Sequence, residues 1–225
     1  MRKAALIAIL LLVAACTRET QGAPERIEPI PPRTATSSTP TTTTSAAPTR
    51  PPEPGAPVAD VIAWIEAGEP ADTEQYHVAT REGTDTDLGS DVAFVTPSGK
   101  SNCMTDSRYS EGALACLVDL KNPPPRPEDA YGEWKGGWVD YDGQSLTVGS
   151  VHGDPGRFTA GTGRVLPYGR TLRFGDYACR VDPVGLYCAN YAFGSAVRFN
   201  DAGIEPFGCL ERQTPPPMIG ELYRC

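Results

Sequence analysis

Side chains that could support hydrolysis are few in this 225-residue chain. The available imidazole bases are His77 and His152, and a nucleophile, a base and an orienting acid can be drawn as Ser98, His152 and Asp154. Ser98 does not stand in a Gly-x-Ser-x-Gly motif, and a carboxylate two residues from His152 is equally suited to capping a turn. A hydrolase using Ser98 and His152 is therefore the alternative function, and no other catalytic residue can be identified.

Six of the seven cysteines are expected to form disulfide bonds. An even set in an exported chain indicates a disulfide framework, which for six cysteines allows fifteen connectivities. Turn-rich segments between neighbouring cysteines favour sequential pairing. The expected pairs are Cys103–Cys116, Cys179–Cys188 and Cys209–Cys225. A zinc site is disfavoured because no Cys-x-x-Cys motif occurs, so we expect no metal.

The remaining cysteine, Cys16, ends a pattern typical of a lipoprotein signal. Arg2 and Lys3 precede an apolar stretch from Ala4 to Val13, and two alanines stand directly before Cys16. This predicts a signal peptide over 1–15, followed by acylation of Cys16 with palmitate-type chains. The alternative is an ordinary secretory signal. We expect a protein anchored by lipid to the extracytoplasmic face of the cell membrane.

The formal net charge is −8, and it becomes −10 once Arg2 and Lys3 leave with the signal peptide. An acidic chain argues against nucleic-acid binding. Residues 157–198 are nevertheless cationic, with six arginines against Asp176 and Asp182. These arginines are explained more simply as solvent-exposed residues on the outward side of strands than as a binding face for an anionic polymer of the cell envelope. The excess of Arg over Lys, with abundant Ala, Gly and Pro, is typical of a GC-rich genome and hints at an actinobacterium.

Three regions are expected along the chain: the signal peptide (1–15), a disordered stalk that begins at the lipidated cysteine (16–57), and a folded domain (58–225). The stalk is rich in Pro and Thr and nearly free of bulky apolar residues, so it cannot bury a core. Such a segment spans up to ~3 Å per residue and serves as a tether.

The folded domain is expected to begin with one short amphipathic helix. Val58, Val61, Ile62 and Ile65 lie on one helical face, and Gly68 follows the pattern. Trp64 flanks this apolar face and is expected to pack in the core or at its rim. Alternation over Gln75 to Thr80, around His77, predicts a strand.

Short strands separated by Gly, Pro and Asp are expected after Gly89. They are 92–96, 102–104, 113–119, 146–151, 164–166, 171–174, 178–181, 186–191 and 196–199. The fold class is therefore mainly β, a small antiparallel sandwich or barrel-like domain with one short N-terminal helix and three disulfides. A weak repeat places Gly shortly before each of the first four domain cysteines, which predicts two disulfide-linked β-hairpins.

Large aromatics gather between Tyr131 and Tyr141. Trp134 and Trp138 within this Gly-rich stretch could stack on sugars or peptides, although aromatics that close a small β core are commoner. Together with Arg164, Arg170 and Arg173 they form the candidate binding face. The segment Asp140-Tyr141-Asp142-Gly143 resembles the start of a calcium loop, but it lacks the later ligands and is better explained as a turn.

Three short motifs carry a resemblance to a known family: Thr96-Pro97-Ser98-Gly99 with Cys103, Leu166-Pro167-Tyr168-Gly169, and the hairpin from Cys179 to Cys188. In this order, over 92–199, they resemble an uncharacterised family of exported actinobacterial, especially mycobacterial, lipoproteins. The chain departs from the pattern at Lys100-Ser101, and it has Cys209 and Cys225 in place of a cysteine pair between the hairpins. The resemblance implies a β-rich exported domain and no catalytic residue.

Together these features predict a membrane-anchored cell-envelope lipoprotein. We expect its domain to be a non-enzymatic binding or structural module without a cofactor. A cell-wall glycan or another exported protein is the expected partner.

Overall fold

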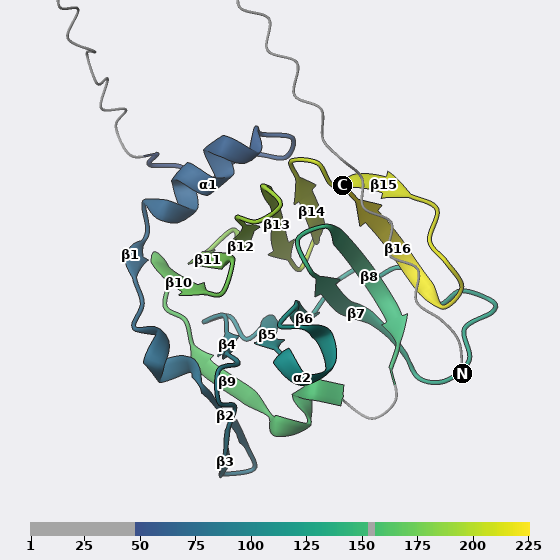
Figure 1. The fold of residues 1–225 in the computed structure, drawn as a ribbon. Coiled ribbons are helices and arrows are strands. Elements are labelled where there is room, and N and C mark those ends of the chain that lie inside the picture. Colours follow the sequence, from purple (N-terminus) through teal and green to yellow (C-terminus); the bar gives the residue numbers. More distant parts are fainter. Residues whose placement is uncertain (1–47, 153–155) are drawn as a thin grey trace, which may run out of the picture. The chain divides into compact units, whose positions relative to one another are not determined.

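The computed structural model describes residues 48–152 and 156–225 (Figure 1). The contacts divide the chain into two units, 1–44 and 45–225, and every described residue belongs to the second. The predicted signal peptide, Cys16, most of the predicted stalk, and Asp154 lie outside the described residues. No helix in the two described stretches is both long enough and apolar enough to cross a membrane.

The domain is mainly β and is built from two sheets. In spatial order, the six-stranded sheet contains β1 (Glu69–Pro70), β10 (Arg170–Phe174), β11 (Tyr177–Asp182), β12 (Gly185–Asn190), β13 (Ser195–Asn200) and β14 (Gly203–Phe207). The ten-stranded sheet contains β15 (Glu211–Gln213), β16 (Ile219–Arg224), β8 (Ser145–Val151), β7 (Trp134–Tyr141), β6 (Leu114–Val118), β5 (Ser101–Thr105), β4 (Ala93–Val95), β9 (Thr162–Val165), β2 (Val78–Arg81) and β3 (Thr84–Asp87). The helices are α1 (Val58–Glu66), α2 (Ser107–Ser110) and two 3₁₀ turns, η1 (Thr73–Tyr76) and η2 (Gly156–Ala160).

Two meanders of five antiparallel strands form the centres of the sheets. One runs from β4 to β8, and the other from β10 to β14. In each meander a disulfide joins directly opposed residues of the second and third strands, Cys103 with Cys116 and Cys179 with Cys188. The predicted repeat of linked hairpins is therefore confirmed, and so is the sequential pairing, since Cys209 bonds to Cys225.

The main core lies between the two sheets. The four cysteines of the hairpins are fully buried in one cluster with Phe94 of β4 and Leu172 of β10. Because side chains alternate across a strand, this shared cluster places the inner faces of the sheets against each other. The domain is a sandwich, and the strands of the described residues close no barrel.

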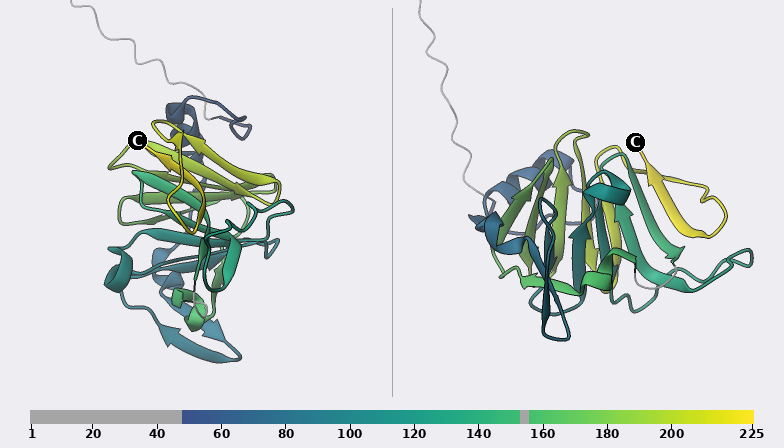
Figure 2. Two further views of the ribbon diagram at one scale, coloured as in Figure 1. Left: turned by 90° about the vertical axis from the view of Figure 1, so that its right-hand side faces the viewer. Right: turned by 60° about the horizontal axis from the view of Figure 1, so that its bottom comes forward.

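The outer face of the six-stranded sheet is covered by α1, as the apolar periodicity predicts (Figure 1). Trp64 is 1% exposed, and its ring centroid lies 4.7 Å from that of Tyr187 on β12. The Arg180 guanidinium lies 4.0 Å from the centroid of the Trp64 ring. Residues upstream of Val58 also contact this face, since the Tyr187 hydroxyl donates to Pro52 O (3.1 Å). The chain therefore joins the sandwich beside α1, and the β2–β3 hairpin lies at the opposite end (Figure 2).

One local prediction was wrong, and the strand β7 was not expected. The stretch Gln75–Thr80 is not one strand, because Asp72 accepts a hydrogen bond from the Glu74 amide (3.3 Å) and caps η1, so that β2 begins only at Val78. The aromatic stretch before Tyr141 is a strand, β7, that the Gly residues concealed. A Cβ at Gly137 would lie 2.0 Å from Val118 O, so the close approach of β6 requires glycine there.

Candidate functional site

Ser98 and His152 are not brought together. The Ser98 hydroxyl lies in the β4–β5 turn, 3.1 Å from Thr96 Oγ1, and accepts from the Lys100 amide (3.3 Å). Ser98 lines a small cavity of about 110 Å³, whereas His152 follows β8 and lines a different cavity. Asp154 lies outside the described residues, so the geometry gives the Ser98/His152 hydrolase no support.

The two tryptophans of β7 pack into the domain. Trp138 is 2% exposed. Trp134 is half-buried, donates from Nε1 to Pro124 O (3.3 Å) and lies over Gly149, where a Cβ would meet its ring at 2.7 Å. Neither ring is an open stacking platform, which agrees with the commoner structural role of such aromatics.

The three arginines of the candidate face lie elsewhere. Arg164 is exposed on β9, which three strands separate from β7. Arg170 and Arg173 belong to the other sheet and form ion pairs with Glu69 (3.0 Å) and Glu66 (3.8 Å). The arginines and tryptophans therefore do not form one binding face, and two of the three charges are neutralised locally.

The calcium-like segment is the hairpin turn between β7 and β8. Asp142 accepts from the amides of Gln144 (2.8 Å) and Ser145 (2.6 Å). Asp140, two residues earlier, lies instead beside Trp138 and Arg157. Within 48–152 and 156–225, no group of three or more His, Cys, Asp or Glu side chains is placed to hold a metal ion.

A cavity of about 790 Å³ lies on the outer face of the ten-stranded sheet, and Asp140 contacts two of the side chains that line it, Trp138 and His152. We call it the Trp138 pocket. Its walls come from β3, α2, the end of β8 and η2. Residues that line it include Asp87, Arg108, Tyr109, Trp138, His152 and Arg157.

The floor of the Trp138 pocket is a stack of rings. The His152 imidazole lies on the Trp138 indole, with centroids 3.5 Å apart and planes inclined by 22°, and Phe158 of η2 meets the indole edge-on at 5.1 Å. Trp138 and Asp140 share a face because they are two residues apart on β7. The indole Nε1 consequently donates to Asp140 Oδ2 (2.9 Å), which holds both groups in place.

A guanidinium group and an imidazole lie beside Asp140. Arg157 Nη2 lies 3.7 Å from Asp140 Oδ1, and His152 Nε2 lies 4.0 Å from Oδ2. Burial raises the pKa of Asp140, and the attraction of Arg157 opposes that rise. Burial lowers the pKa of His152 from 6.5, against the pull of Asp140. At pH 7 the imidazole is therefore neutral and offers both a donor and an acceptor to a ligand.

The rim of the pocket is a short helix held by two carboxylates. Asp106 caps α2 by accepting from the amides of Arg108 and Tyr109 (both 3.0 Å). Asp91 accepts from the Ser107 amide (2.8 Å) and from the Ser107 hydroxyl (2.8 Å). This network fixes the backbone that presents Arg108 and Tyr109, and leaves the Tyr109 side chain 77% exposed.

Sequence reasoning singled out Trp138 and His152 but did not pair them. It missed Arg157, Arg108 and Tyr109 as pocket residues, because 18 or more positions separate η2 and α2 from Trp138 in the sequence. One local signal was present: Asp106 followed by Ser107 and Arg108 is a helix N-cap pattern.

The fold and the cavity define a class of protein: a disulfide-bonded β-sandwich with a polar cavity on the outer face of one sheet. Comparison of the chain with protein-family models, curated proteins and solved structures found no match.

Proposed function

We propose that this protein is a lipid-anchored envelope protein whose domain binds a neutral glycan of the cell wall in the Trp138 pocket, without catalysis. The observation that carries the proposal is the composition of that pocket. It joins a neutral imidazole, the guanidinium groups of Arg108 and Arg157, the Asp87 carboxylate and an exposed phenol around a fixed aromatic floor.

A sugar suits this lining better than a charged polymer does. Hydroxyl groups donate and accept, and the pocket offers acceptors at Asp87 and donors at Arg108 and His152. Arg157 is occupied by Asp140 and by Ala113 O (2.9 Å), so it adds little attraction for an anion. The volume of about 790 Å³ is in the range of small-ligand sites.

The anchor is the second part of the proposal. Cys16 would carry the lipid, and the Pro/Thr-rich stretch after it would span the space between the membrane and the domain. The described chain joins the sandwich beside α1, whereas Asp87 of the pocket belongs to β3 at the opposite end (Figure 2). A ligand on the far side of the domain would thus be accessible from the cell wall.

Binding of the full chain to cell-wall glycan fragments tests the pocket. We expect Arg108→Ala and His152→Ala each to weaken binding about fivefold or more, as for the loss of a direct hydrogen bond. Arg173→Ala is the matched control, because its guanidinium lies over a tyrosine ring at 5.6 Å just as that of Arg108 does at 5.0 Å. Equal affinities in all three variants would refute the pocket, and capture of an exported protein instead would replace the glycan.

Metabolic labelling with a fatty-acid analogue tests the anchor. The wild-type chain should incorporate label and fractionate with membranes, and Cys16→Ala should lose both properties. Labelling that persists in Cys16→Ala would refute acylation at this residue.

A further inference from the structure

The Cys209–Cys225 disulfide differs from the other two disulfides in its exposure. Both of its residues are exposed, whereas the four cysteines of the hairpin disulfides are 0% exposed. It joins the loop after β14 to the residue after β16, so it closes the chain around the β15–β16 hairpin. A thiolate attacks a disulfide only where it can reach a sulfur atom. Among the disulfides of the described residues, Cys209–Cys225 is therefore the one open to an external thiol.

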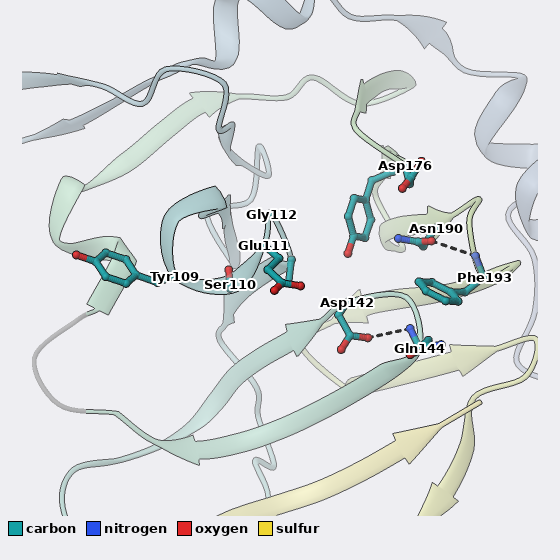
Figure 3. Close-up of a pocket in the computed structure, with 11 residues that line it drawn as sticks. Tyr109, Ser110, Glu111, Gly112, Asp142, Gln144, Asp176, Asn190 and Phe193 are labelled. Atoms are coloured by element: carbon teal, nitrogen blue, oxygen red, sulfur yellow. Dashed lines mark hydrogen bonds between the residues drawn. The ribbon is translucent and has the colours of Figure 1, made fainter. Parts of the chain in front are cut away.

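A cavity of about 410 Å³ gives access to Cys225, and its other lining residues are Asp142, Gln144, Ser145 and Arg224. The Asp142 carboxylate is engaged by the turn itself, since it accepts from the amides of Gln144 (2.8 Å) and Ser145 (2.6 Å) (Figure 3). Arg224 forms no ion pair within the described part of the chain. Its guanidinium is thus available to attract a thiolate toward Cys225.

The β15–β16 hairpin lies at the edge of the ten-stranded sheet, where β16 pairs with β8 over Ile219–Arg224 (Figure 1). All three residues of β15 are exposed, and β16 fully buries only Leu222 and Tyr223. The ion pair of the hairpin, between Arg212 and Glu221 (3.2 Å), joins its own two strands. The hairpin is therefore held on the sandwich mainly by backbone pairing with β8, by two buried side chains and by the disulfide.

We propose that Cys209–Cys225 is a thiol–disulfide exchange site, and that its reduction by an external dithiol releases the β15–β16 hairpin from β8. One thiolate of the dithiol would attack Cys225 Sγ, the bond to Cys209 Sγ would break, and Cys209 would leave as a thiolate. The second thiolate of the dithiol would then attack the mixed disulfide and free Cys225. The two protons of the dithiol pass to the two cysteines, so the protein disulfide is reduced by two electrons and the dithiol is oxidised to a disulfide.

Release of the hairpin would uncover one edge of β8. The other edge of β8 pairs with β7, so only the backbone N–H and C=O groups that now pair with β16 would become free. An unpaired strand edge is a template to which an extended segment of another chain can add. The redox state of the exposed disulfide would thus control access to this edge, independently of the proposed glycan pocket and of the lipid anchor.

Stepwise reduction of the purified full chain in detergent micelles tests the exchange site. Dithiothreitol is the probe, free thiols are trapped with N-ethylmaleimide, and mass spectrometry of the peptides identifies the cysteines that react. We expect labelling of Cys209 and Cys225 at a dithiothreitol concentration about tenfold or more below that which labels Cys103 or Cys179. Labelling of all these cysteines at the same concentration would overturn the proposal.

Two monothiols of opposite charge test the role of Arg224. Mercaptoethanesulfonate is anionic and cysteamine is cationic, so the ratio of their exchange rates reports the charge at the cavity. Arg224→Gln should lower this ratio about threefold. Arg164→Gln is the matched control, because Arg164 is likewise exposed and forms no ion pair in the described chain but lies on β9. A ratio in Arg224→Gln equal to that of the wild type would remove Arg224 from the site.

Hydrogen exchange measures the release of the hairpin. The disulfide spans 16 residues and restricts the opened hairpin, so its selective reduction should raise the exchange rate of the β16 amides about a hundredfold. The β12 amides, beside the buried Cys179–Cys188 bond, are the control and should stay protected. Unchanged exchange in β16 after selective reduction would refute the release.

A double variant repeats this measurement without reductant. Cys209→Ser/Cys225→Ser should show the same fast exchange in β16, and protection of β12 checks that the variant is folded. If β12 loses protection, the selectively reduced wild type decides the outcome, and reoxidation with oxidised glutathione should restore the slow exchange of β16. Slow exchange of β16 in a folded double variant would contradict the proposal.

Discussion

Removal of the buried Cys103–Cys116 disulfide should cost more stability than removal of the exposed Cys209–Cys225 disulfide. The first bond closes 13 residues and the second 16, so the loss of loop-closure entropy is about 3 kcal/mol for each. Burial differs, because Cys103 and Cys116 are 0% exposed whereas Cys209 and Cys225 lie at the surface. Replacing the buried pair by alanine deletes two sulfur atoms from the core. The burial of each sulfur stabilises the fold by about 1 kcal/mol, as the burial of a methylene group does.

The expected losses in the free energy of unfolding are therefore about 5 kcal/mol for Cys103→Ala/Cys116→Ala and about 3 kcal/mol for Cys209→Ala/Cys225→Ala. Urea unfolding at equilibrium under non-reducing conditions, followed by tryptophan fluorescence, measures both against the wild type. Equal losses in the two double variants, or a larger loss from the surface pair, would refute the argument that burial between the sheets adds to the effect of the crosslink.

Three further outcomes are expected. Gly137→Ala, whose Cβ would lie 2.0 Å from Val118 O, should lower the free energy of unfolding by about 2 kcal/mol or more. The control Gly99→Ala, at φ 72° with open space around it, should lower it by only about 1 kcal/mol. Similar melting temperatures of the two variants would contradict the close approach of β6 to Gly137. Burial lowers the pKa of His152 in the folded state, so the unfolded chain binds a proton on this imidazole more readily, and the free energy of unfolding should fall as the pH decreases below about 6.5. A His152→Gln variant should show a shallower fall in melting temperature between pH 7 and 5. An identical slope would exclude His152 as the cause. Trp64→Ala should cost about 3 to 5 kcal/mol and expose α1 to limited proteolysis, and wild-type resistance would show that the helix does not depend on this ring.

Local patterns predicted much of the fold. The period of Val58, Val61 and Ile65 predicts α1, and the alternation along β10 predicts a strand with Leu172 and Phe174 on its inner face. The disulfide pairing was also predictable, because opposed residues of a hairpin are close both in sequence and in space. The β7 strand was missed because its glycines look like a loop until β6 is seen to lie against them.

The candidate sites were less predictable, because their residues come from distant segments. Trp138 lies beneath His152 and Phe158 only because η2 folds back over the outer face of the ten-stranded sheet. The arginines expected on one face are divided between two sheets by their strand positions.

The sequence by itself determined the mainly β class, the leading helix, the cysteine pairs and the expectation of a lipid anchor, since each depends on residue type and short-range spacing. Only the tertiary structure decided that the two hairpins face each other as a sandwich, and which polar side chains share a cavity. The reason is physical: pairing between strands and packing between sheets depend on many long-range contacts formed together, and no short stretch of sequence contains them.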